Sequence, residues 1–215
     1  KRINKMKKLI FIIVIMISSL PALAQVVRIN NGLSISTFSG KTEHDDRALL
    51  NYSGGIGLDY LNKDYYFLNS EVNFIRKGER YYDNISPVVE DALGFKRYSE
   101  CLDYVSVSTS VNGKLPLGKF VPFIGMGLRG DFLISNSIRT KGERYDEYSM
   151  LGTPRHAMIG VVLNAGFLFD FQKWDFGFRY SGLLDFLSSY SNAKHNAYTQ
   201  TIDFTIGIKL RKSVQ

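Results

Sequence analysis

The sequence predicts an all-β protein, a single eight-stranded antiparallel transmembrane β-barrel with short periplasmic turns and long external loops. Two observations predict it: segments in which apolar and polar residues alternate, and connections that alternate between short and long. The clearest segment is residues 158–171, where every second residue from Ile159 to Phe171 is apolar and those between are mostly small or polar. This period of two is typical of a strand with one apolar face. Its length suits a tilted strand that crosses a bilayer better than a strand in a soluble domain.

The sequence of residues 1–25 is typical of a secretory signal peptide, so we do not expect this segment to be part of the fold. A basic head is followed by an apolar run over residues 9–17, and Ala22-Leu23-Ala24 provides a small-residue cleavage site. The apolar run is shorter than the roughly 20 residues that a membrane-spanning helix needs. We therefore expect cleavage before Gln25 or Val26, and an outer-membrane β-barrel domain over residues 26–215.

The charge balance excludes one class of partner. The chain has 27 Lys and Arg against 20 Asp and Glu, but five of the basic residues lie in the predicted signal peptide. The remainder is nearly neutral, so the high pI does not predict nucleic-acid binding. A single cysteine, Cys101, excludes an internal disulfide. Tyrosine and phenylalanine are abundant and proline is scarce, which favours strands.

Eight segments have the alternating pattern. They are residues 27–38, 52–61, 66–76, 102–115, 120–133, 158–171, 174–183 and 198–210. Residues 62–64, 117–119 and 172–173 form short connections, whereas residues 39–51, 78–101, 135–155 and 184–197 form long ones. Short turns at one end and long loops at the other are typical of a membrane barrel, and the even number of strands places both termini at the short-turn end.

The apolar face of these strands is predicted to face lipid. A soluble, lipocalin-like barrel would turn the same face inward, but the interior of eight strands is too narrow for so many large side chains. The opposite face carries Gly, Ser and charges of both signs, which we expect to pair with one another and fill the lumen. The predicted lumen charge network consists of Glu71, Lys114, Arg129, Asp131, Arg179 and Asp203. The alternative is that these charges line a small pore.

Three strand segments carry a family resemblance. They are Val121-Pro122-Phe123-Ile124-Gly125-Met126-Gly127-Leu128, Phe176-Gly177-Phe178-Arg179-Tyr180 and Phe204-Thr205-Ile206-Gly207-Ile208-Lys209-Leu210. With the signal peptide, these segments resemble the porin-like, PorT-like family of outer-membrane β-barrel proteins over residues 26–210. The resemblance implies a barrel in the outer membrane of a Gram-negative bacterium, surrounded by outer-membrane lipid and inserted by the barrel-assembly machinery. Leu210 stands where the family usually has a terminal aromatic residue.

No catalytic or cofactor motif stands out. His44, His156 and His195 are isolated, no His-x-x-x-His spacing occurs, and no glycine-rich phosphate loop links a strand to a helix. We therefore expect no cofactor, no metal and no enzymatic activity. One alternative is a lipid-modifying enzyme, for which His156 with Ser149 and Glu147 would form the catalytic set.

Tyrosine and arginine recur in two of the predicted loops. Arg80, Tyr81 and Tyr82 lie in residues 78–101, and Arg144 and Tyr145 in residues 135–155. These residue types often dominate protein recognition, although the tyrosines equally suit an upper aromatic girdle. The predicted function is therefore a structural or interaction role in the cell envelope, through loop-mediated binding or support of envelope or secretion machinery. The alternatives are an outer-membrane lipid-modifying enzyme and a small-solute pore.

Overall fold

The computed structural model of the chain describes residues 24–39, 47–82, 97–139, 144–146, 153–190 and 196–210. These residues form nine strands: β1 (Ala24–Ser39), β2 (Arg47–Tyr60), β3 (Tyr66–Tyr82), β4 (Arg97–Lys114), β5 (Phe120–Arg139), β6 (Arg144–Asp146), β7 (Ala157–Asp170), β8 (Trp174–Asp185) and β9 (Asn196–Lys209). The predicted signal peptide lies outside the described residues, except for Ala24 and Gln25, which begin β1. No helix among the described residues is long and apolar enough to cross a membrane.

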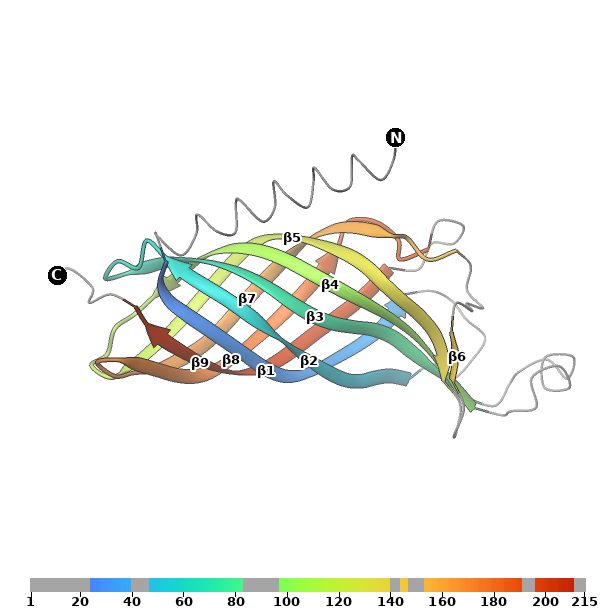
Figure 1. Ribbon diagram of the computed structural model, residues 1–215, viewed down its shortest axis with the longest axis horizontal. Helices are drawn as coiled ribbons and strands as arrows, with labels where there is room; N and C mark the ends of the chain where they lie inside the picture. The colour runs from blue at the N-terminus through green and yellow to red at the C-terminus, as the bar shows by residue number, and fades with distance from the viewer. Residues whose placement is uncertain are drawn as a thin grey trace, which may run out of the picture.

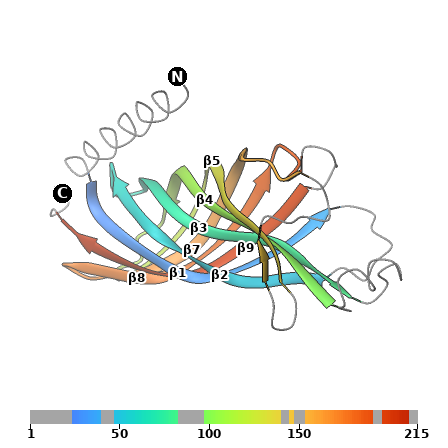
Figure 2. The ribbon, with the colours of Figure 1, turned by 45° about the vertical axis from the view of Figure 1, so that its right-hand side comes forward.

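Eight of the strands close into a barrel. Each pairs antiparallel with the next in the order β1-β2-β3-β4-β5-β7-β8-β9, and β1 returns to β9 from Val26↔Lys209 to Ser39↔Asn196. Figures 1 and 2 show the strands tilted around a common axis. The predicted eight-stranded antiparallel barrel is confirmed. The three-residue β6 is an addition that pairs only with the far end of β5.

The short turns gather at one end of the barrel, where β1 begins and β9 ends (Figure 1). They join β2 to β3, β4 to β5, and β7 to β8. In the second turn, Leu117 and Phe120 exchange backbone hydrogen bonds of 2.9 and 3.3 Å. Gly118 between them has a φ of 69°, a left-handed conformation that glycine adopts without steric cost.

At the opposite end, four strands continue well beyond their predicted limits: β2, which starts at Arg47 within the predicted loop 39–51, and β3, β4 and β5. β3 runs to Tyr82, β4 starts at Arg97 and β5 reaches Arg139, so much of the predicted loops 78–101 and 135–155 is strand. The pairing of β3 with β4 is unbroken from Tyr66↔Gly113 to Tyr82↔Arg97. The sequence pattern stops earlier because the outward positions there are no longer consistently apolar, as Arg76 and Asp103 show.

The outward and inward faces of the barrel differ as predicted. Large apolar side chains point outward, with Ile124 71% and Leu163 44% exposed. The inward positions carry small, polar and charged residues that are mostly buried. Inside the barrel, the described residues form two small apolar clusters, one of Ile75, Val162 and Leu183 and the other of Leu102, Tyr104, Met158 and Tyr190, and Phe67 packs edge-on against Phe123 with ring centres 5.7 Å apart. Hydrogen bonds between strands and buried polar contacts therefore hold most of the interior together.

Candidate functional site

The lumen is the candidate site, and its first group of charges lies nearest the short turns. Arg28 on β1 donates hydrogen bonds to Asp59 on β2 (Nε to Oδ2, 3.1 Å) and to Asp175 on β8 (Nη1 to Oδ1, 2.7 Å). Asn69 on β3 donates a further bond of 2.7 Å to Asp59. All four side chains are buried. We call Arg28, Asp59 and Asp175 the lower cluster.

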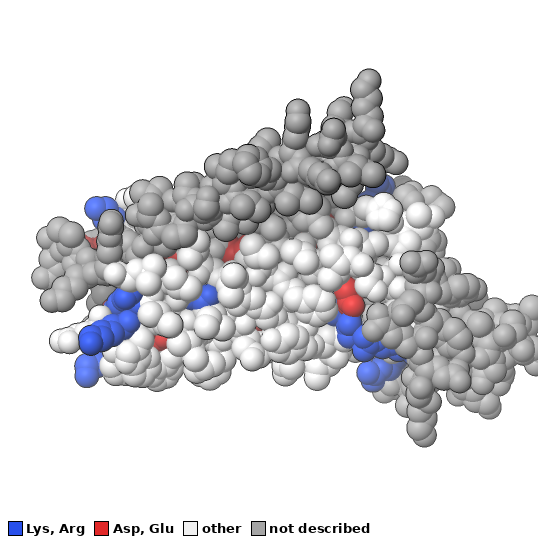
Figure 3. Space-filling view, in the orientation of Figure 1, with Lys and Arg blue, Asp and Glu red and all other residues white. Residues whose placement is uncertain are grey.

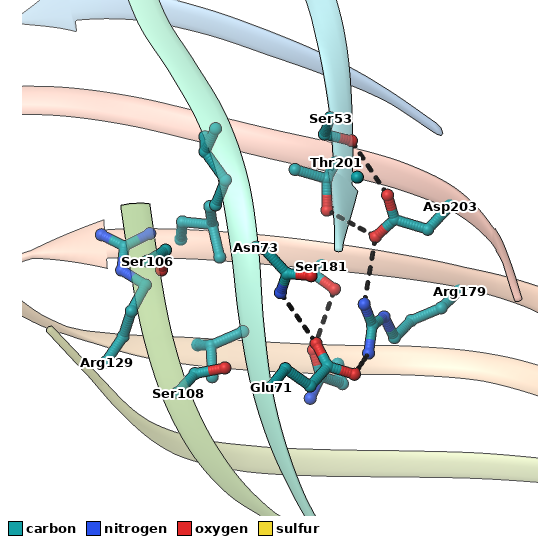
Figure 4. A pocket seen from close by; sticks show the side chains of 15 residues that line it. Ser53, Glu71, Asn73, Ser106, Ser108, Arg129, Arg179, Ser181, Thr201 and Asp203 are labelled. Atoms are coloured by element: carbon teal, nitrogen blue, oxygen red, sulfur yellow. Dashed lines mark hydrogen bonds and ion pairs between the residues drawn. The ribbon is translucent and has the colours of Figure 1, made fainter. Parts of the chain in front are cut away.

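The middle of the lumen repeats this arrangement around Arg179 on β8. Its guanidinium forms ion pairs with Glu71 on β3 and Asp203 on β9 (Figure 4). Asn73 donates to Glu71 at 2.9 Å, and Ser53 donates to Asp203 at 2.9 Å. Arg179, Glu71 and Asp203 form the middle cluster, in which one cation again serves two carboxylates.

The upper cluster contains two cations and two carboxylates. Lys77 on β3 contacts Asp131 (2.7 Å) and Asp185 (2.8 Å), and Arg129 on β5 pairs with the same two acids. The Lys77 ammonium also lies 5.1 Å from the centre of the Tyr104 ring. Lys77 and Arg129 thus neutralise Asp131 and Asp185, whereas the lower and middle clusters each have one cation for two carboxylates.

An apolar layer lies beyond the upper cluster. Leu102 and Tyr104 on β4 and Met158 on β7 pack with Tyr190, which lies in the segment after β8 and is fully buried. The Tyr190 hydroxyl donates to Glu100 Oε1 at 2.8 Å, and a β-bridge joins Tyr190 to Pro154. These contacts hold Tyr190, in the segment after β8, against β4 and β7 at the end of the barrel opposite the short turns.

Small cavities lie between these layers. The cavity between the middle and upper clusters has a volume of about 20 Å³ and is lined by Glu71, Arg129, Arg179 and Asp203 among others. A second, beside Arg28 and Phe67, has about 10 Å³, and a third, at the short-turn end, has about 80 Å³. A single water molecule needs roughly 10–15 Å³, so the inner two cavities hold about one water each.

The structure divides the predicted lumen charge network. Glu71, Arg179 and Asp203 meet in the middle cluster, and Arg129 and Asp131 meet in the upper one. Lys114 forms none of the described ion pairs: it donates to the Asn62 amide oxygen at the short-turn end, where it lines the same cavity as Arg28, Asp59 and Asp175. The prediction omitted Arg28, Asp59, Lys77, Asp175 and Asp185. Arg28, Asp59 and Asp175 lie on the inward side of their predicted segments, and Lys77 and Asp185 lie on the same side just beyond the predicted ends.

The predicted recognition residues lie on strands rather than in loops. Arg80, Tyr81 and Tyr82 end β3, and Arg144 and Tyr145 belong to β6. The two groups flank the ends of β4 and β5 at the end of the barrel opposite the short turns, since β3 pairs with β4 and β6 pairs with β5. A role for them in recognition stays a prediction. Apart from Arg80, their side chains lie outside the described part of the structure.

The described residues contain no metal-binding group of three or more His, Cys, Asp or Glu side chains. His156 is exposed just before β7. The other members of the alternative catalytic set, Ser149 and Glu147, lie outside the described residues, as do His44 and His195.

No protein-family model matches the chain, and no curated protein matches it. Solved structures do. Neisserial surface protein A (NspA) aligns with a TM-score of 0.51 at 15% identity, covering 86% of this chain and 96% of that chain. The outer membrane protein OprG from Pseudomonas aeruginosa aligns with a TM-score of 0.50 at 10% identity, covering 87% and 97%. The likeness is one of fold: the chain has the architecture of eight-stranded outer-membrane β-barrels.

Proposed function

We propose that the protein is a non-enzymatic outer-membrane β-barrel with a structural or interaction role in the cell envelope. In this role the barrel is a sealed, rigid support that presents the long connections at one of its ends to a partner in the envelope. The observation that carries the proposal is the lumen filled by three ionic clusters and an apolar layer, with cavities of about 10, 20 and 80 Å³ between and beside them.

The outer surface supports the membrane location. Large apolar side chains such as Ile124, Met126 and Leu128 are exposed in succession along β5, and the other strands have similar outward rows. Exposing such a surface to water is unfavourable, whereas lipid accepts it. Outer-membrane lipid is therefore the first partner, and the barrel-assembly machinery is the partner during insertion.

The two alternative functions have less support. A small-solute pore needs an open lumen, and the paired charges of the middle and upper clusters fill it. A lipid-modifying enzyme needs a nucleophile and a base in contact, and His156, the candidate base, is exposed with no described catalytic partner.

Fractionation, electrophoresis and conductance measurements together test the proposal. We expect the protein in the outer-membrane fraction, with faster migration in unboiled than in boiled samples because the folded barrel resists detergent. We also expect no steady conductance when the purified barrel is inserted into planar bilayers. Recovery in the soluble periplasm would refute the membrane location, and a steady open channel would replace the sealed support with a pore.

A further inference from the structure

One corner of the short-turn rim gathers residues from β7, β8 and β9 and from the β4–β5 and β7–β8 turns. The Asp170 backbone N–H at the end of β7 donates to the Lys119 carbonyl in the β4–β5 turn (2.7 Å). The Lys209 N–H at the end of β9 donates to the Lys173 carbonyl in the β7–β8 turn (2.9 Å). These bonds fix three lysines, Lys119, Lys173 and Lys209, beside the β7–β8 turn. We call these lysines, with Phe171 and Trp174, the basic corner.

The charges of this corner do not balance. Lys209 forms an ion pair with Asp170 and also donates to the Phe171 carbonyl at 2.7 Å, so the charge of Asp170 is already compensated. Asp175 points into the lumen, where Arg28 holds it. Among the described residues, no carboxylate pairs with Lys119 or Lys173, and both are exposed. The corner therefore carries two positive charges in excess. Figure 3 shows basic side chains projecting at the short-turn end of the molecule.

Aromatic rings lie next to these charges. Phe171 stacks on Trp174 with ring centres 4.5 Å apart, and the Lys119 ammonium lies 5.7 Å from the Phe171 ring. Trp174 is 46% exposed on the outward face. Exposed tryptophan is enriched at the level of lipid headgroups, and lysine extends its ammonium from there towards water. The two free ammonium groups thus lie at the depth of the lipid phosphates.

We propose that the basic corner is a binding site for the phosphate headgroup of an anionic phospholipid in the leaflet that surrounds the short turns. Lys119 and Lys173 bind the phosphate, and Phe171 and Trp174 pack against the glycerol and upper acyl chain. The inference rests on the proposed membrane location. A membrane lipid suits the site better than an acidic soluble partner because the lysines and the lipid-facing rings lie side by side.

Trp174 is the only tryptophan of the chain and lies within the proposed site, so its fluorescence measures the lipid beside it. The barrel is reconstituted in two sets of vesicles with the same mixture of phosphatidylcholine and phosphatidylglycerol. In one set only the phosphatidylglycerol has brominated chains, and in the other only the phosphatidylcholine has them. We expect stronger quenching of Trp174 when the phosphatidylglycerol is brominated, with a preference that weakens as salt is added.

Substitution of the lysines identifies the site. Each lysine near an anionic membrane surface is worth roughly fivefold in binding, corresponding to about 1 kcal/mol, so Lys119→Gln and Lys173→Gln should each reduce the preference severalfold and together abolish it. Lys63→Gln is the matched control. It removes the same charge from the β2–β3 turn, which β4 separates from the β4–β5 turn on one side and β1 separates from β9 on the other. The control should keep the wild-type preference.

The quenching experiment separates a failure of the proposed membrane location from a failure of the lipid site. If neither brominated lipid quenches Trp174, the rim does not lie in a bilayer and the proposed function fails. If both lipids quench it equally in the wild type, the barrel is inserted but the lipid site is refuted. An equal loss of preference in Lys63→Gln and in Lys173→Gln would also refute the site, because net charge alone would then explain the effect.

Discussion

Arg28 on β1 and Asp175 on β8 are 147 positions apart in the chain, yet Arg28 Nη1 lies 2.7 Å from Asp175 Oδ1 inside the lumen. β9 lies between their strands in the barrel wall, so this hydrogen bond passes over a strand. The contact therefore requires that β1 and β8 are both paired with β9. Arg28 also binds Asp59 on β2. A single guanidinium therefore links strands on both sides of the β1–β9 pairing, which closes the barrel.

Removing this cation should destabilise the barrel strongly. Arg28→Met leaves Asp59 and Asp175 buried without their cation, and we expect the free energy of unfolding to fall by about 3–5 kcal/mol. Urea titrations of the barrel in lipid vesicles measure the change. Lys63→Met is the control, since it removes a positive charge from an exposed turn and should change stability by less than about 0.5 kcal/mol. Equal losses in the two variants would contradict the role assigned to Arg28.

In the middle cluster, the loss in the free energy of unfolding should depend on which partner is removed. Glu71→Ala leaves Arg179 paired with Asp203, so we expect a loss of about 2–3 kcal/mol, mainly from hydrogen bonds to charged groups. Glu71→Gln keeps the shape and a hydrogen-bond acceptor and should cost about 1 kcal/mol. Arg179→Met leaves two buried carboxylates without their cation and should cost about 3–5 kcal/mol. The same urea titrations test this order, and a Glu71→Ala variant less stable than Arg179→Met would reverse it.

The alternating pattern was sufficient to predict the inward direction of these charges, but not their partners. Arg179 points inward because its neighbours Phe178 and Tyr180 face lipid, and the sequence shows this directly. Glu71 lies 108 positions earlier, and its meeting with Arg179 depends on the tilt and relative shift of all the strands between them. Strand patterns do not encode that shift, so the division into three clusters required the structure.

The pattern also failed at the strand ends, for a physical reason. Lys77 and Asp185 occupy inward positions on β3 and β8, but both lie just past the point where the predicted segments end. An apolar outward row is needed only where a strand contacts lipid. Beyond that level the pairing of β3 with β4 continues, and Arg76 and Asp103, at directly paired positions there, form an ion pair on the outward side. A strand that leaves the bilayer therefore looks like a loop in the sequence.

The outward row predicts the effect of a charge in the lipid. Leu163, on β7, is 44% exposed on the face that contacts lipid. Leu163→Arg places a guanidinium near the middle of the membrane, and we expect a loss of roughly 2–4 kcal/mol in unfolding titrations in lipid vesicles. Leu163→Val is the control and should change stability by less than about 1 kcal/mol. A harmless arginine at this position would contradict the assignment of the apolar row to the lipid.

The lumen is filled both by the apolar layer around Tyr190 and by the paired charges of the upper and middle clusters, and substitution of Tyr190 tests which of them seals it. Tyr190 packs with Leu102, Tyr104 and Met158, and Tyr190→Ala removes most of that contact. We expect this variant to lose about 3 kcal/mol of stability, as large-to-small changes of buried aromatic residues do. It should still show no steady conductance in planar bilayers, because the upper and middle clusters remain in place. Tyr190→Phe keeps the packing and loses only the hydrogen bond to Glu100, so it is the control. A steady channel in Tyr190→Ala, with none in Tyr190→Phe, would mean that the apolar layer alone blocks the lumen and that the paired charges below it leave room for ions.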